Sequence, residues 1–335
     1  MNELLIGLVG ALVATNQPLA VSNLIQQHAG VSVAVVNPDD PAEKELARVM
    51  ADDDAAMDEV DRWIRDNSAF TAQGAGESKE ALNQRIHTRL DSVRKEYEDF
   101  LQRYPNSARG HLAYGTFLND LGEEVAAAGE YQKSAMLDPK NPAAWNQLGN
   151  FCGEHGPLTN AFVDYAKAIE LDPAEPLYYR NLATTVYLFR KDAKAFYSLK
   201  DDAEVFDKSL ALYRKAMQLA PDDFLLATDY AETYYGIRPL RTNDALAAWT
   251  NALHVAHDDN EREGVLIHLA RIKIAAGRFA EARAQMDEIT NGAFTDLKYR
   301  LKRSLAEHEN ALTNSSPAAS TNPPAAPAET PGQAP

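Results

Sequence analysis

The sequence predicts an all-α protein made of stacked antiparallel helix pairs. In the stretch 142–175, apolar residues recur at helical spacing in two separate runs. Gly156 and Pro157 lie between the two runs, and both residue types break helices. The same pattern occurs 34 residues earlier, where His111 occupies the position that corresponds to Trp145. It also continues after residue 175. Because one pair of short helices cannot bury both of its faces, a repeated pair predicts a stack.

The stretch 142–175 sets the pattern that the other repeats follow. Small residues at Gly149 and Ala161 predict a close approach of the two helices, and Pro173 ends the unit. The first helix has an apolar stripe of Trp145, Leu148, Gly149 and Cys152, and the second has Ala161, Tyr165 and Ala168. The matching positions 34 residues earlier are His111, Gly115, Gly122, Ala127, Tyr131 and Pro139.

This pattern resembles the tetratricopeptide repeat family, in its bacterial type, which combines a Trp, a Leu-Gly pair, an Ala-x3-aromatic unit and a Pro on a 34-residue period. The resemblance implies a right-handed superhelical α-solenoid. It also implies that the first helices of successive pairs line a concave groove where extended peptides or helices bind. The resemblance covers residues 108–296, divided into repeats 108–141, 142–175, 176–223, 224–262 and 263–296.

The third repeat departs from the period. Its closing Pro221 follows Pro173 by 48 residues instead of 34, and the extra residues fall within 190–207. This segment, RKDAKAFYSLKDDAEVFD, is aromatic and locally basic. It is interpreted either as a binding insertion or as a helix extension that packs on the array, since insertions in arrays form loops and helix extensions.

Capping helices are expected at both ends of the array. At the N-terminal end, 41–107, an Asp40-Pro41 helix start predicts a helix to about Asn67, then a loop over 67–77 and a second helix over 78–103. At the C-terminal end, 297–312 forms a polar-faced helix, and the Pro- and Ala-rich tail 313–335 is expected to be disordered. Ten acidic residues lie between Asp39 and Asp61, either as a docking face for a basic partner or as a solvated helix face.

The first 22 residues carry the apolar run LLIGLVGALVA at 4–14, followed by a linker over 23–40. The run has the length of a signal-peptide core, but no Lys or Arg precedes it. The alternative is an N-terminal helix packed on the array. The first interpretation places the protein in the periplasm or outside the cell and the second in the cytoplasm, with membrane association only if residues 1–22 are retained.

Charge and motifs exclude several function classes. With 49 acidic and 33 basic residues the net charge is −16, which argues against nucleic acid as a partner. The sequence has no phosphate loop, no dinucleotide fingerprint, no Gly-x-Ser-x-Gly and no Cys-x-x-Cys. The lone Cys152 is expected to be buried, and the pair His254 and His257 lacks the further ligands of a metal site. We therefore expect no catalysis, no cofactor, no metal and no small-molecule substrate.

The candidate binding residues lie beside the buried stripe of each first helix. Asn amides pair with peptide backbone, Arg guanidiniums hold carboxylates and Tyr rings offer rigid contact area. These residues are Asn119, Asn146, Asn150, Arg180, Thr184, Tyr187, Glu232, Tyr235 and Arg271. Leu112 stands where some members of the family carry a lysine that clamps a terminal carboxylate, so that specificity is not expected here.

The expected function is a non-catalytic scaffold or adaptor that binds a protein or a peptide in the groove. Two alternatives stay open. One is a structural component of a cell-envelope or secretion assembly, and the other is a regulatory subunit of an enzyme complex. The sequence leaves the oligomeric state and the identity of the partner open.

Overall fold

The computed structural model describes residues 39–72 and 74–315, and in these ranges it confirms the all-α fold class: every regular element is a helix. The predicted N-terminal segment 1–22, the linker up to residue 38 and the tail from 316 lie outside the described residues. The chain forms two compact units that divide between Asp244 and Ala245, within the predicted fourth repeat. We call them the first and second units.

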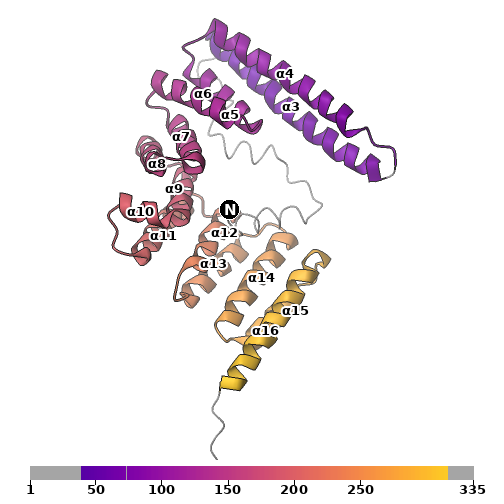
Figure 1. The fold of residues 1–335 in the computed structure, drawn as a ribbon, viewed down its shortest axis with the longest axis vertical. Helices are drawn as coiled ribbons and strands as arrows, with labels where there is room; N and C mark the ends of the chain where they lie inside the picture. Colours follow the sequence, from indigo (N-terminus) through magenta and orange to yellow (C-terminus); the bar gives the residue numbers. More distant parts are fainter. Residues whose placement is uncertain (1–38, 73, 316–335) are drawn as a thin grey trace, which may run out of the picture. The chain divides into compact units, whose positions relative to one another are not determined.

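The described part of the first unit starts with a helical hairpin, α3 (Pro41–Ala72) and α4 (Lys79–Arg103) (Figure 1). Asp40 is the cap that the sequence predicts, and its Oδ1 accepts the N–H of Ala42 (2.9 Å). Ser78, at the predicted start of the second helix, caps α4, where its Oγ accepts the N–H of Ala81 (3.2 Å). However, α3 runs past the predicted end at Asn67, so most of the predicted loop 67–77 is wrong. The residues 67–72 contain no Gly or Pro, and among the residues described after α3 the first with a positive φ is Gly74 (76°).

Many of the acidic side chains of α3 are held by neighbouring helices. Arg89 of α4 binds two of them, with Nη2 2.8 Å from Asp52 Oδ1 and Nε 2.9 Å from Glu59 Oε2. Tyr97 donates its hydroxyl to Asp53 Oδ2 (2.8 Å), and burial raises the pKa of Asp53 to about 7. Two further pairs are Glu43 with Arg109 and Glu45 with Arg103. These contacts give the acidic run a structural role in fixing the hairpin.

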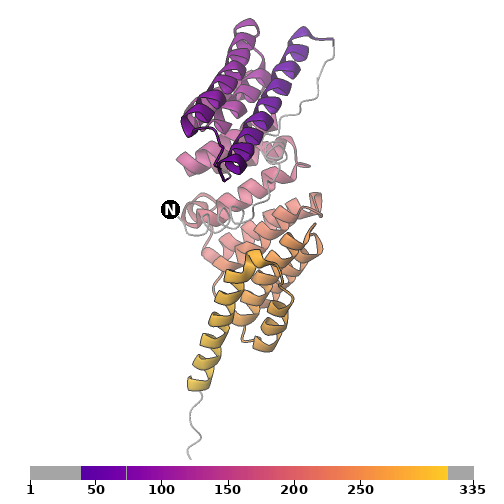
Figure 2. The same cartoon turned by 90° about the vertical axis from the view of Figure 1, so that its right-hand side faces the viewer.

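Successive helix pairs follow the hairpin, and they confirm the predicted architecture of stacked antiparallel pairs. In both views α5 to α9 lie side by side in chain order (Figures 1 and 2). The helices are α5 (Ala108–Asp120) with α6 (Glu124–Leu137), α7 (Pro142–His155) with α8 (Leu158–Leu171), and α9 (Pro176–Leu188) with α11 (Asp202–Leu219). Next come α12 (Phe224–Thr233) and a 3-10 turn, η1 (Tyr234–Gly236).

The close approach predicted at Gly149 is present between α7 and α8. A Cβ placed on Gly149 would lie 2.7 Å from Cδ1 of Tyr165, and Gly115 stands in the same relation to Tyr131, at 2.6 Å from Cε1. Real Cβ atoms do not approach other atoms so closely, so the glycine lets the buried tyrosine ring pack flat on the partner helix.

Alanine at Gly149 is therefore expected to destabilise the protein, whereas alanine at Gly153 of the same helix should stabilise it. Overpacking costs about 1–3 kcal/mol, and the better helix propensity of alanine returns about 1 kcal/mol. At Gly153 the nearest atom is Tyr165 Oη at 3.6 Å, so only the propensity gain remains. Urea unfolding of both variants measures the difference, and equal stabilities would contradict the packing argument.

The extra residues of the third repeat form a short helix, α10 (Arg190–Phe196), and the first turns of α11. Ala193 and Val205 are fully buried, and the ring of Phe162 from α8 lies 5.2 Å from Phe196 and 5.5 Å from Tyr197. Two of the three lysines of the segment pair locally, Lys194 with Asp202 (3.0 Å) and Lys200 with Glu204 (3.3 Å). These contacts support the interpretation of 190–207 as a packed helix extension.

The second unit begins within α13 (Thr242–His254) and contains α14 (Asp259–Ala275), α15 (Phe279–Asp287), the 3-10 turn η2 (Gly292–Phe294) and α16 (Thr295–Ser315). Its core includes the fully buried Trp249, whose ring stacks on His268 at 4.0 Å. Because α16 continues to Ser315, residues 313–315 are helical, contrary to the predicted disordered tail. Among the described helices, none combines the length and the apolar character that crossing a membrane requires.

Candidate functional site

Most of the predicted binding residues of the first unit lie along three consecutive first helices, α7, α9 and α12, which contact one another in chain order. Asn146 and Asn150 of α7 meet Asn181 of α9, whose Nδ2 donates to Asn146 Oδ1 (2.9 Å) and Asn150 Oδ1 (3.2 Å). Asn150 also accepts the hydroxyl of Tyr165 (2.8 Å) and donates to Gln147 Oε1 (2.7 Å). The amides thus form a network that joins two repeats.

The polar contacts continue from α9 to α12 and α11. Arg180 of α9 binds Asp229 of α12, with Nε 2.6 Å from Oδ2, and both side chains are mostly buried. Thr184 shares a hydrogen bond with the hydroxyl of Tyr213 (2.7 Å), and burial raises the pKa of that tyrosine well above its usual range. We call the residues Asn146, Asn150, Asn181, Arg180, Asp229 and Thr184 the polar strip.

Members of the polar strip differ in exposure. Asn146 is buried, with 1% of its surface accessible, so its amide serves mainly to join α7 to α9. Asn150, Arg180 and Thr184 stay partly exposed. Asn181 and Asp229 are partly exposed as well, so every member of the strip except Asn146 is oriented by protein contacts and also reaches solvent.

The remaining predicted residues are distributed around the strip. Tyr187 is buried against Phe206, with ring centroids 5.9 Å apart. The negative charge of Glu232 adds to burial in raising the pKa of Tyr187. Asn119 is exposed near the end of α5, and Tyr235 is partly exposed in η1. Arg271 belongs to α14 of the second unit. The structure therefore brings together the α7 and α9 residues, while Asn119 belongs to α5, which contributes no residue to the polar strip.

Two members of the strip, Asn181 and Asp229, were not predicted. The sequence did offer a reason to consider Asn181. It directly follows Arg180, and Arg180 is the residue that corresponds to Asn146 after a shift of 34 residues. Asp229 had no such signal, since the longer third repeat obscures the register between α9 and α12. Both residues were missed because helical spacing shows which residues share a face of one helix. It does not show which side chains on different helices pair.

The chemistry of the strip suits recognition. It offers neutral amides, a hydroxyl and an arginine whose charge is balanced by its own aspartate. Cys152 lies nearby on α7, and burial raises the pKa of its thiol, which disfavours the reactive thiolate.

No family model matches the chain, and no curated protein sequence matches it. Solved structures do resemble it. PilW, described as a widely conserved type IV pilus biogenesis factor, is 14% identical with a TM-score of 0.50, and the alignment covers 67% of this chain and 96% of PilW. This chain has the tetratricopeptide-repeat fold.

Two other solved structures with this fold align less closely. PilF from Pseudomonas aeruginosa is 15% identical, with a TM-score of 0.47, over 78% of this chain and 99% of PilF. YrrB, described as a tetratricopeptide protein with an unusual peptide-binding site, is 14% identical, with a TM-score of 0.46, over 62% of this chain and 97% of YrrB. At these identities the likeness concerns the fold alone.

Proposed function

We propose that the tetratricopeptide array of the first unit is a scaffold that binds an extended peptide segment of a partner protein along the polar strip. The observation that carries this proposal is the run of fixed polar side chains across α7, α9 and α12. Each side chain is held by a partner on the next helix, so little conformational entropy remains to be lost when a ligand binds.

The residue types of the strip fit an extended peptide. Asn150 and Thr184 offer amide and hydroxyl groups that pair with a peptide backbone, whatever side chains the peptide carries. Arg180 uses Nε for Asp229, which leaves the other guanidinium nitrogens to meet an acidic group or a carbonyl of the ligand. Two buried rings, Tyr213 and Tyr187, support the strip from beneath.

Selection of a phage-displayed library of random peptides on the full chain tests this proposal. We expect enriched peptides that bind wild type with a Kd of about 1–100 μM, the range of modest peptide interfaces. The double variant Asn150→Asp/Arg180→Lys keeps the acceptor oxygen and the positive charge that the fold uses, but it changes the donors toward the ligand. It should bind the same peptides at least about 10-fold more weakly, a loss of about 1.4 kcal/mol.

The control makes the same chemical changes on the second helices of the pairs. Gln132 of α6 and Arg214 of α11 are exposed, so Gln132→Glu/Arg214→Lys should leave peptide affinity unchanged. Peptides that bind both double variants as tightly as wild type would place the binding surface elsewhere. A selection that enriches nothing over protein-free beads would contradict peptide binding itself.

A further inference from the structure

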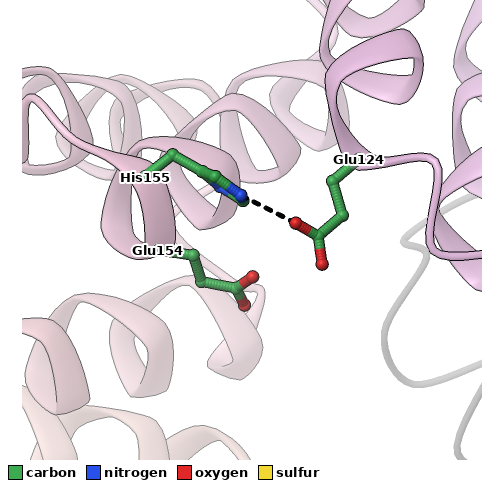
Figure 3. Close-up of side chains that lie close together, drawn as sticks. All are labelled: Glu124, Glu154 and His155. Atoms are coloured by element: carbon green, nitrogen blue, oxygen red, sulfur yellow. Dashed lines mark ion pairs between the residues drawn. The ribbon is translucent and has the colours of Figure 1, made fainter. Parts of the chain in front are cut away.

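We propose that Glu124, Glu154 and His155 form a binding site for one divalent first-row transition-metal ion, with Zn²⁺ as the representative ion. The ligand atoms of the three side chains all lie within 4.8 Å of one another. Glu154 and His155 come from one helix, and Glu124 faces them from the next (Figure 3). The proposal is independent of peptide binding by the polar strip.

The fold explains why these three residues meet. Helices α6 and α7 are antiparallel neighbours joined by the short turn 138–141. The first residue of α6 must therefore lie beside the last residue of α7, and these are Glu124 and His155. At the equivalent places of the next junction, α8 begins with Leu158 and α9 ends with Leu188, which offer no ligands. The cluster is thus particular to the junction between the first two helix pairs.

The orientation of His155 suits a metal ligand that faces Glu124. Its Nδ1 lies 3.2 Å from the carbonyl oxygen of Phe151, and its ring stacks on that of Phe151 at 4.5 Å. A proton on Nδ1 directed to a carbonyl is the arrangement that orients a metal-binding histidine and leaves the Nε2 lone pair outward. That Nε2 lies 2.7 Å from Glu124 Oε2. At this distance the two atoms are bridged either by a hydrogen on Nε2 or, once the side chains move slightly apart, by a metal ion that both atoms bind.

The second carboxylate is available for an ion. Glu154 is exposed, and within the described residues its carboxylate belongs to no salt bridge. A proton shared between His155 and Glu124 would leave Glu154 unused beside another negative charge. A metal ion would engage all three groups after side-chain rotations that bring each ligand atom to about 2.0–2.2 Å from it.

The ligand set selects the class of metal. One imidazole nitrogen with two carboxylate oxygens suits Zn²⁺, Co²⁺, Ni²⁺ or Mn²⁺, whereas Mg²⁺ and Ca²⁺ favour sites with oxygen alone. The side chains of His155 and Glu124 are 36% and 42% exposed, so water completes the coordination. An ion held there would join α6 to α7 and strengthen the contact between two repeats.

Isothermal titration of the untagged full chain with Zn²⁺, in a buffer that does not chelate metal, tests the site. We expect micromolar or tighter binding by wild type, with Mg²⁺ at least about 10-fold weaker. His155→Gln and Glu154→Gln should each lower Zn²⁺ affinity by about 10-fold or more at this site. Glu154→Gln breaks no salt bridge, so it tests the site even if His155→Gln reduces stability.

His308 provides a matched control. Its Nδ1 also faces the carbonyl oxygen four residues earlier, that of Ser304 (2.8 Å), and its side chain is exposed. Among the described residues, it belongs to no cluster of three ligands. Zn²⁺ binding should be the same in His308→Gln as in wild type. Wild type that binds no Zn²⁺ below about millimolar concentration would overturn the proposal. Unchanged binding by both His155→Gln and Glu154→Gln would also overturn it.

Discussion

Replacing Phe162 with alanine is expected to lower the free energy of unfolding of the first unit by about 3–5 kcal/mol, the usual cost of removing a buried phenylalanine. Phe162 has 0% of its surface exposed and belongs to a core cluster with Leu182 of α9 and Val205 of α11. Its ring also contacts Phe196 and Tyr197 of the third-repeat insertion. The cavity would therefore weaken the packing of α8, α9 and the insertion together.

The measurement is urea unfolding at 25 °C followed by far-ultraviolet circular dichroism, with Val163→Ala as the matched control. Val163 is the next residue of α8 and is 53% exposed, so its replacement should change stability by no more than about 0.5 kcal/mol. If Phe162→Ala and Val163→Ala behaved alike, the insertion would not be docked on α8, and the interpretation of 190–207 as a binding element would regain support.

Much of the repeat architecture was predictable because it depends on the spacing of small and large residues along the sequence. The two helices approach closely at Gly149 as expected, since positions in a 34-residue unit determine which faces touch, and the structure adds that Tyr165 is the residue Gly149 meets. Helix ends were predicted well where a capping side chain stands, as at Ser78. They were predicted poorly at 67–72, because the loop inferred from Gly74 and Gly76 was extended back over residues that do not break the helix.

The contacts of the candidate binding face were less predictable than the fold. The sequence identifies Asn146 and Asn150 as neighbours on one helix, and periodicity places them near the next repeat. The sequence does not reveal that Asn146 is buried or that Arg180 forms an ion pair with Asp229. Those facts depend on the distance between helices and on the register across a longer repeat. The cluster of Glu124 with Glu154 and His155 was not predictable for the same reason, because Glu124 is distant in sequence from the other two residues and the three follow no ligand-spacing motif.

Removing Asp229 alone is expected to destabilise the first unit by about 2–3 kcal/mol. Breaking a buried ion pair costs about 3–5 kcal/mol because one charge is left without its partner, and the value here is reduced by partial exposure. The side chains of Arg180 and Asp229 are 16% and 15% exposed. In Asp229→Ala the guanidinium would remain between α9 and α12 with its Nε unpaired. Urea unfolding against wild type gives the difference.

The double variant Arg180→Leu/Asp229→Leu separates the effect of an unpaired charge from the value of the pair. Burial raises the pKa of Asp229 even though Arg180 opposes the shift, so removing this carboxylate from water costs more than the attraction returns. An apolar pair of similar volume should therefore be as stable as wild type or more stable. A double variant as unstable as Asp229→Ala would mean that the ion pair itself holds α9 against α12. A stable double variant that no longer binds the selected peptides would instead show that the charges are retained for recognition.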